Sequence, residues 1–516
     1  MILTGLVVGA LLGIVMQRGR FCVTGMLRDI FLQRSWRTFT ALMVVIAVHG
    51  VGIAALTSAG VISPEYEGFA PVAVVVGSLM FGLGIVLAGG CASGTWYRAA
   101  EGLVGSWIAL AMYAVSSAAM KKGALGGFTT WMKQWDTGLT TVPAALGVSP
   151  WVFAILVLVV AGLMVRHFLL KERRIAKPAT PSNRPRWKRP LHFYTAGALI
   201  GLIGVVAWPL SAATGRNDGL GITTPSSNIV KFVVTGDGGS IDWGVMLVLG
   251  LFVGAFVAAK ASGEFRVRVP DARTATRSVA GGVMMGVGAS LAGGCTVGNG
   301  MVQTGLFTFQ GWVSLVFIAL GVGLGARLWL RPTTSPRVSR GATGATGTDG
   351  VTTSSAASGS EGGTYSTSES LDNTLTVASD GRSIDPAPIG SGSVGSEPAG
   401  VGTGRAGTTS ASAVFGGFAA VPDAVGIKEK TQASSTLREL GNGYYALDSL
   451  GAVCPFPLID AKDVMTTLDS GDHLVIDFDC TQATEAIPHW AAEDGHEITD
   501  FREKGDASWQ ITLRKA

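Results

Sequence analysis

Nine long apolar stretches occupy the first 330 residues, and each is near the length that a helix needs to cross a membrane. They cover residues 2–16, 38–60, 71–90, 103–119, 149–165, 191–209, 241–259, 278–293 and 311–326. Only 14% of the chain is charged, against about 25% in an average soluble domain. We therefore expect residues 1–332 to form a polytopic α-helical membrane domain. Several stretches are short or rich in glycine, which predicts helices that stop inside the membrane and re-enter it.

The basic residues are unevenly divided among the connections between these stretches. The odd-numbered connections carry 24 Lys or Arg and the even-numbered ones carry 5. Basic connections stay on the cytoplasmic side, so we expect the N-terminus outside and the C-terminus inside a bacterial plasma (inner) membrane, among its lipids. Arg18 and Arg20 follow the first stretch instead of preceding it, which argues against a cleavable signal peptide.

The rest of the chain has a different composition. Residues 341–410 contain 40 Gly, Ser or Thr out of 70, which predicts a disordered linker over 333–436. Residues 437–516 carry 15 acidic and 6 basic residues, a net charge of −9 (6 minus 15). Their pattern predicts the order βαβαββ, with strands near 444–447, 473–478, 497–501 and 509–513 and helices ending near 468 and 494. We expect a small two-layer α/β sandwich.

A duplicated segment with a cysteine in it links the two halves of the membrane region. Residues 77–94 align without gaps with 281–298, and both copies contain Leu-Ala-Gly-Gly-Cys, ending at Cys91 and Cys295. These cysteines follow the third and eighth stretches, an odd number of crossings apart, so the repeats are predicted to be inverted. The glycine pairs Gly89–Gly90 and Gly293–Gly294 allow the backbone to turn before each thiol.

The thiols are the candidate substrate path. We expect short helices at about 92–100 and 296–306, whose free N–H groups attract anions, and neutral thiols that suit a soft, sulfur-bearing anion. A third membrane cysteine, Cys22, follows Arg18 and Arg20; at an offset of 188 its counterpart would be Leu210. The arginines either anchor the chain at the inner face or gather an anion there. The alternative for the thiols is that they are small packing residues.

Two further cysteines lie in the C-terminal domain. Cys454 stands in Cys454-Pro455-Phe456-Pro457, between a predicted strand and a predicted helix, and this position favours a nucleophilic thiolate. Cys480 either resolves an oxidised or sulfur-loaded Cys454 or is inert. With no CxxC pair and no Cys/His cluster, no metal or other cofactor is expected, and we expect no nucleic-acid partner.

Residues 1–330 resemble the YeeE/YedE family of sulfur-compound transporters, some of which import thiosulfate. The segment from Gln17 to Asp29 and the two Leu-Ala-Gly-Gly-Cys units carry this resemblance. The resemblance implies that Cys22, Cys91 and Cys295 line the path. The last 77 residues resemble the TusA/SirA sulfur carriers, whose CPxP motif bears a persulfide; Asp448, Gly451 and Gly495-His496-Glu497 match as well. Many soluble carriers of this family have another residue at the position of Cys480. A cysteine here resembles the carrier variant that acts together with the transporter.

The leading hypothesis is thiosulfate uptake with sulfur handed to the fused carrier domain, which docks on the cytoplasmic face and passes sulfur to downstream acceptors. The carrier domain is then a candidate sulfurtransferase that acts on thiosulfate. Alternatives are a membrane-anchored sulfurtransferase or thiol redox enzyme, and a transporter of another sulfur or selenium oxyanion. The sequence contains no P-loop motif, so we do not expect ATP hydrolysis by this chain. His49 is the one candidate for proton coupling, and its alternative role is packing.

Overall fold

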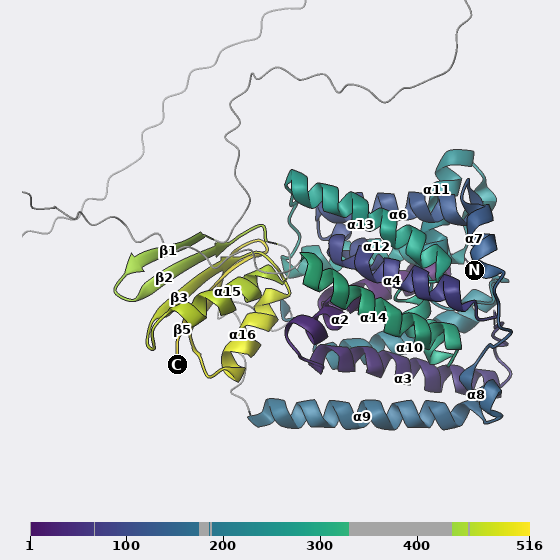
Figure 1. Ribbon diagram of the computed structural model, residues 1–516, viewed down its shortest axis with the longest axis horizontal. Coiled ribbons are helices and arrows are strands. Elements are labelled where there is room, and N and C mark those ends of the chain that lie inside the picture. Colours follow the sequence, from purple (N-terminus) through teal and green to yellow (C-terminus); the bar gives the residue numbers. More distant parts are fainter. Residues whose placement is uncertain (1, 67, 175–184, 186–187, 330–435, 453–454) are drawn as a thin grey trace, which may run out of the picture. The chain divides into compact units, whose positions relative to one another are not determined.

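The computed structural model describes residues 2–66, 68–174, 185, 188–329, 436–452 and 455–516. The membrane domain up to residue 329 is helical throughout (Figure 1). Its first half contains α1 (Leu3–Arg18), α2 (Val23–Leu32), α3 (Arg37–Ser58), α4 (Pro71–Leu87), α5 (Ala92–Ala100), α6 (Val104–Lys122), α7 (Gly126–Lys133) and α8 (Val142–Leu146). Its second half follows α9 (Pro150–Arg174) and contains α10 (Phe193–Ala212), α11 (Thr223–Thr235), η2 (Gly238–Ser240), α12 (Trp243–Ser262), α13 (Ala272–Leu291), η3 (Gly298–Gln303) and α14 (Phe309–Trp329).

Each of the nine predicted stretches coincides with a long helix: α1, α3, α4, α6, α9, α10, α12, α13 and α14. Among the described residues, seven segments are long and apolar enough to cross a membrane by themselves. The two helices outside that set, α6 and α13, carry more polar residues and pack against each other. Their polar side chains include exposed residues at the helix ends, such as Arg273 of α13 and Lys122 of α6, and buried ones that face the bundle, such as Ser117.

The helices are paired in the way that an inverted repeat requires. Helix α1 packs against α12, and its counterpart α10 packs against α3, the counterpart of α12. In the same way α6 packs against α13 and α11, while α14 packs against α4 and α2. These contacts between the halves therefore occur twice with the roles exchanged, and α4 packs against its own counterpart, α13. The single long helix α9 between the halves supplies the odd crossing.

This pairing corrects the sequence alignment around Cys22. Leu210 lies inside α10, whereas the residue that occupies the position of Cys22, the N-cap of the following helix, is Ile222. The offset between the halves grows from 188 in the first helix to 200 here, because the second half has a longer connection before α11, and it reaches 204 at Cys91. Only one half therefore carries a thiol at this position.

Glycines explain how α4 and α13 approach each other. A Cβ atom on Gly77 would lie 2.7 Å from the carbonyl oxygen of Gly288, and one on Gly84 would lie 2.9 Å from that of Gly281. Gly281 and Gly288 are the repeat equivalents of Gly77 and Gly84, so each glycine packs against the counterpart of the other. The spacing that revealed the duplication is thus the contact surface between its copies.

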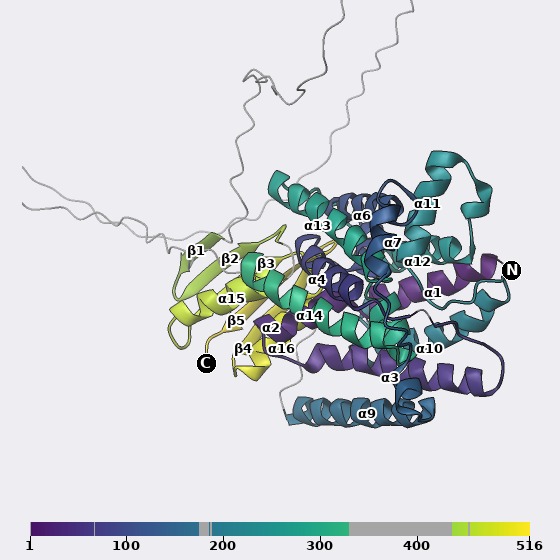
Figure 2. The ribbon, with the colours of Figure 1, turned by 45° about the vertical axis from the view of Figure 1, so that its right-hand side comes forward.

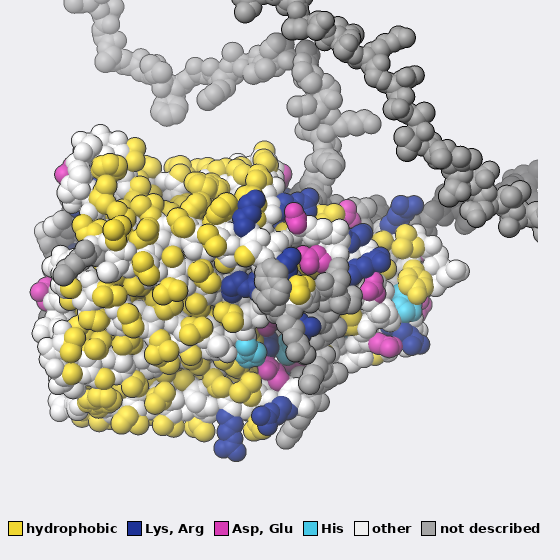
Figure 3. Space-filling view, turned by 180° about the vertical axis from the view of Figure 1, so that it is seen from behind, with side chains coloured by type: hydrophobic (Ala, Val, Ile, Leu, Met, Phe, Trp, Pro, Cys, Tyr) yellow, Lys and Arg dark blue, Asp and Glu magenta, His cyan; other side chains and the backbone are white. Residues whose placement is uncertain are grey.

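The outer surface of the membrane domain is apolar. Figure 3 shows hydrophobic side chains over most of the visible face of the bundle. Helix α9 contributes exposed Ile155, Leu156, Val159 and Leu163, and packs against α3 at the edge of the bundle in Figures 1 and 2. These surfaces fit a hydrocarbon environment.

The C-terminal domain is a five-stranded mixed sheet in the order β1-β2-β3-β5-β4, with two helices. Its elements are β1 (Thr436–Gly441), β2 (Tyr444–Ser449), α15 (Phe456–Thr467), β3 (His473–Phe478), α16 (Ala483–Glu493), β4 (Glu497–Gly505) and β5 (Ser508–Arg514). The sheet carries alternate buried residues such as Leu474, Ile476 and Phe478 into one core with the helices. The predicted order omitted β1, so the prediction was one strand short.

Candidate functional site

Cys91 is placed by a glycine turn at the start of a short helix. Gly89 adopts a left-handed φ of +71°, and the chain then enters α5 with Cys91 as the N-cap residue. The Cys91 Sγ atom accepts a hydrogen bond from the Gly94 amide at 3.4 Å. The thiol is fully buried. Helix α5 covers the predicted range 92–100, and the free amide groups of its first turn face the thiol.

Cys22 meets Cys91 although the two are 69 positions apart in the sequence. Cys22 is the N-cap of α2 and is 2% exposed. A Cβ atom placed on Gly94 would lie 3.3 Å from the Cys91 sulfur and 3.5 Å from the Cys22 sulfur. Both thiols therefore lie over the first turn of α5, and only a glycine at position 94 leaves the space between them open.

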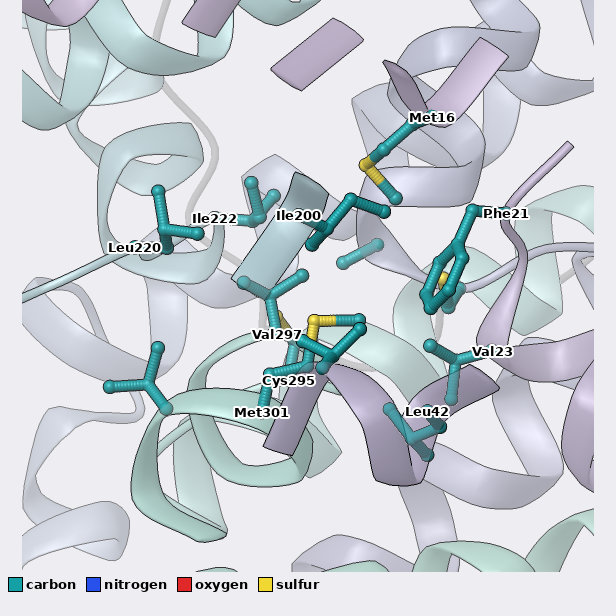
Figure 4. Packing of buried hydrophobic residues seen from close by; sticks show 14 of the residues in the cluster. Met16, Phe21, Val23, Leu42, Ile200, Leu220, Ile222, Cys295, Val297 and Met301 are labelled. Carbon is teal, nitrogen blue, oxygen red and sulfur yellow. The ribbon is translucent and has the colours of Figure 1, made fainter. Parts of the chain in front are cut away.

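Cys295 occupies the equivalent position in the second half, but its surroundings differ. Gly293 has a left-handed φ of +80°, and the following helix η3 is a π-helix over Gly298–Gln303, not an α-helix over 296–306. Cys295 belongs to one buried cluster with Met16, Ile200, Ile222, Val297 and Met301, which Figure 4 labels.

Polar residues connect Cys295 with the other thiols. Thr296, directly after Cys295, interacts with Cys91 and is fully buried. Tyr113 interacts with Cys295 and donates a hydrogen bond from its hydroxyl group to Thr223 Oγ1 at 2.8 Å. Cys22, Cys91 and Cys295 are free thiols. The structure thus brings together the three cysteines that the sequence singled out.

The turns before Cys91 and Cys295 are held by polar side chains that sequence reasoning missed. Arg98 donates a hydrogen bond to the carbonyl oxygen of Gly89. Asn299 does the same in the second half, donating to the carbonyl oxygens of Ala292 at 2.8 Å and Gly294 at 3.2 Å. Both side chains lie one or two helical turns beyond the cysteine on the chain, but no sequence motif marks them.

Positive charge lies beside Cys22, but it comes from residues other than the two predicted. The guanidinium groups of Arg98 and Arg28 are close enough to interact electrostatically with Cys22. Arg20, by contrast, forms a buried ion pair with Glu264 at 2.9 Å, and Arg18 donates to the backbone carbonyl of Arg189. Arg20 also adopts an unusual positive φ of 49°. No sequence motif marks Arg98, because its charge reaches the site only through the fold of α5.

His49 lies in α3 and is 2% exposed. A Cβ atom on Gly305 would lie 2.7 Å from its Nδ1 atom, and one on Gly204 would lie 2.9 Å from its Cδ2 atom. The ring therefore fits between two glycines from the second half, an arrangement that favours the packing role.

A cavity of about 150 Å³ lies near the C-terminal end of α6. Its lining includes Gly293, Gln310, Lys133 and Asp136. Gly293 is two residues before Cys295, so the cavity borders the turn that carries this thiol. Lys133 supplies a positive charge at its rim.

The C-terminal site is built at the end of the sheet where β2 and β3 stop. These strands are parallel, so α15 and α16, which follow them, begin at the same end. Cys454 lies outside the described residues; Pro455 directly after it is the N-cap of α15, as the Pro pair predicted. Asp479 is buried, and its Oδ1 atom accepts a hydrogen bond from the Gly451 amide at 3.0 Å, which holds the β2–α15 loop.

Cys480 follows Asp479 at this end of the domain. It is 5% exposed and forms a disulfide, unlike the three free membrane cysteines. Among the residues that the structure describes, no group of three or more His, Cys, Asp or Glu is arranged to hold a metal ion.

Comparisons with known proteins agree with this division. The family described as "Sulphur transport" matches residues 18–324, and the family "Sulfurtransferase TusA" matches residues 445–515. The chain is 49% identical over 348 residues to the thiosulfate transporter TsuA of Escherichia coli, covering 66% of this chain and 99% of that protein. It is 32% identical over 335 residues to TsuA of Spirochaeta thermophila, covering 62% of this chain and 97% of the relative.

The last domain has relatives of its own. It is 64% identical over 70 residues to the putative sulfur carrier protein TsuB of Escherichia coli, covering 14% of this chain and 93% of that protein. The match confirms the resemblance of both parts. The chain belongs to the sulphur-transport (YeeE/YedE) family of multi-pass membrane proteins and carries a TusA domain at its C-terminal end.

Proposed function

We propose that this chain imports thiosulfate along its buried cysteines and delivers the outer sulfur atom to its own TusA domain. The observation that carries the proposal is the meeting of the Cys22 and Cys91 thiols over Gly94, beside the guanidinium groups of Arg28 and Arg98. Sulfur-bearing groups and positive charge together suit a soft, sulfur-containing anion. The relatives named thiosulfate transporters support this choice of substrate.

The proposed route uses the orientation that we expect from the charge asymmetry of the connections, with the N-terminus outside and the C-terminal domain in the cytoplasm. In this orientation the cavity with Lys133 and Gly293 is the outer mouth. Thiosulfate passes first Cys295, then Cys91, and leaves beside Cys22. A neutral S–H group donates only weak hydrogen bonds, so a thiol such as Cys91 passes the anion on without holding it tightly.

At the inner end the carrier domain accepts sulfur. The Cys454 thiolate attacks the outer sulfur of thiosulfate, the S–S bond breaks, and sulfite leaves with the electron pair, so that Cys454 bears a persulfide. Its position before the N-terminus of α15 favours the thiolate. Cys480 then resolves this product: its thiol forms a disulfide with Cys454 and hydrogen sulfide leaves, unless a downstream acceptor takes the sulfur first.

Radiolabelled uptake into proteoliposomes that contain the full chain tests the transport claim. We expect the wild type to accumulate label, and the double variant Cys91→Ala, Cys295→Ala to lose most of it. The Gly162→Ala variant on α9, where nothing lies within 4 Å of an added Cβ, should take up thiosulfate like the wild type. Full uptake by the double variant would refute the cysteine path.

Competition for uptake and the detection of disulfides separate the alternatives. Sulfate, sulfite and selenite competing as well as thiosulfate would indicate a transporter of another oxyanion. A Cys91–Cys295 disulfide that forms during turnover would instead favour a thiol redox enzyme.

A further inference from the structure

Two buried glutamates lie together at the end of α5 that is remote from Cys91. Glu101 stands between α5 and α6 and is 4% exposed, and Glu264 follows α12 and is 1% exposed. The Nε2 atom of Gln17, in the last turn of α1, donates to Glu101 Oε1 at 3.2 Å and to Glu264 Oε2 at 2.7 Å. One amide group therefore bridges two carboxylates from opposite halves of the repeat.

The backbone fixes the two segments against each other. The Arg266 amide donates to the carbonyl oxygen of Glu101 at 3.1 Å, and the Arg268 amide donates to that of Gly102 at 2.9 Å. These hydrogen bonds hold the backbone segments that carry Glu101 and Glu264 side by side.

Charged groups from several elements surround the pair. Glu264 is paired with Arg20, and a Cβ atom on the neighbouring Gly263 would lie 3.7 Å from the Nζ atom of Lys188. Among the described residues, Glu101 interacts electrostatically with Arg98 and Arg268. Arg98 is hydrogen-bonded to the Gly89 carbonyl oxygen, and Lys260 of α12 lies over the Phe265 ring instead. The first turns of α6 contribute no titratable side chain.

The side chain of Gln17 has a hydrogen-bond acceptor that lacks a donor in the described part of the chain. Gln17 is fully buried, and within the described residues its Oε1 atom has no hydrogen-bond donor. A protonated carboxyl group would supply one, because its O–H can donate to Oε1 when the amide turns over. Burial and the neighbouring Glu264 also raise the pKa of the Glu101 carboxyl to about 7.

We propose that Glu101, Gln17 and Glu264 form a proton-binding site that is coupled to thiosulfate beside Cys22 and Cys91, so that thiosulfate enters together with protons. The inference rests on the proposed function. Arg98 is the link, because it interacts with both Glu101 and Cys22 and holds the turn before Cys91. An anion beside Arg98 increases the proton affinity of Glu101, and by reciprocity a proton on Glu101 strengthens anion binding.

The experiment uses the full chain in proteoliposomes with a pH-sensitive dye inside and the membrane potential held at zero by potassium and valinomycin. We expect external thiosulfate to acidify the lumen. An inward gradient of one pH unit should raise accumulation about tenfold for each proton carried. Glu101→Gln keeps the shape of the side chain and should take up thiosulfate down its gradient without acidification. Glu101→Asp keeps the carboxyl group and should retain coupling.

The control is Glu65→Gln, an exposed carboxylate outside the cluster, which should behave like the wild type. The inference is overturned if wild-type uptake ignores the pH gradient, if a sodium gradient drives it instead, or if Glu101→Gln remains fully coupled. If the wild type takes up no thiosulfate under any gradient, the proposed function itself fails. The wild-type measurement decides the matter even if a variant does not fold.

Discussion

Position 94 joins two thiols that arrive from different helices. The Cβ of an alanine there would lie 3.3 Å from the Cys91 sulfur, which would have to shift by a few tenths of an ångström, and would fill the space next to the Cys22 sulfur at 3.5 Å. We expect Gly94→Ala to lower the rate of thiosulfate uptake several-fold while the protein remains folded. Uptake kinetics and thermal unfolding in detergent measure the two effects separately.

Gly162→Ala is the matched control for this prediction, since it adds the same methyl group where no atom lies within 4 Å. Unchanged uptake by Gly94→Ala would show that the space between Cys22 and Cys91 is not on the path of the substrate.

At this scale the sequence identified the thiols but not their charged neighbours. Cys91 and Cys295 stood out because each ends a repeated Leu-Ala-Gly-Gly-Cys unit, and Cys22 because it is the third cysteine of the membrane region. Arg98, Glu101 and Glu264 did not stand out, because single charged residues near the ends of helices are common and their meeting depends on the tertiary fold. Arg20, predicted from its place beside Cys22, is instead paired with Glu264.

At the scale of elements, the crossing of α4 and α13 depends on glycines that face each other. A Cβ on Gly288 would lie 2.5 Å from the Phe81 amide nitrogen and 2.6 Å from the Gly77 carbonyl oxygen. We expect Gly288→Ala to destabilise the protein by about 1–3 kcal/mol, because backbone atoms cannot move aside as a side chain can. Thermal unfolding in detergent should show a lower midpoint.

Gly162→Ala again provides the comparison and should be neutral or slightly stabilising, because alanine is the better helix former. An equal effect of the two substitutions would contradict the view that the α4–α13 contact is the tightly packed centre of the repeat.

The positions of the long helices were predictable from apolar runs because lipid requires them. The π-helical form of η3 was not predictable, since nothing in residues 296–306 distinguishes a π-helix from an α-helix. Strand β1 was missed for another reason. Its Thr436–Gly441 segment lacks alternation, but the signal was present in Asn442-Gly443, both with positive φ, which is typical of a two-residue hairpin turn.

At the scale of the whole molecule, the proposal requires an acidic domain with a net charge of −9 to find a cytoplasmic face rich in basic residues. Glu485, in the first turn of α16, lies at the end of the domain where α15 follows Cys454. We expect Glu485→Lys to slow sulfur transfer from imported thiosulfate several-fold at low salt. The difference should disappear near 1 M salt, where the screening length is about 3 Å.

Glu439→Lys makes the same change of charge at the other end of the sheet, where β1 pairs with the start of β2, and should have a smaller effect. Equal slowing by both variants would indicate that only the net charge of the domain matters. No dependence on salt in the wild type would contradict electrostatic docking.

The central claim is that one chain both imports thiosulfate and receives its sulfur. The most direct measurement supplies thiosulfate labelled at the outer sulfur to sealed proteoliposomes whose C-terminal domains face the lumen, followed by mass spectrometry of the peptide that contains Cys454. We predict a labelled persulfide on Cys454 in the Cys480→Ala chain, which lacks the resolving thiol, and none when Cys91→Ala is added to it. Label that fills the lumen without ever reaching Cys454, or that reaches it equally when Cys91→Ala is added, would contradict the account.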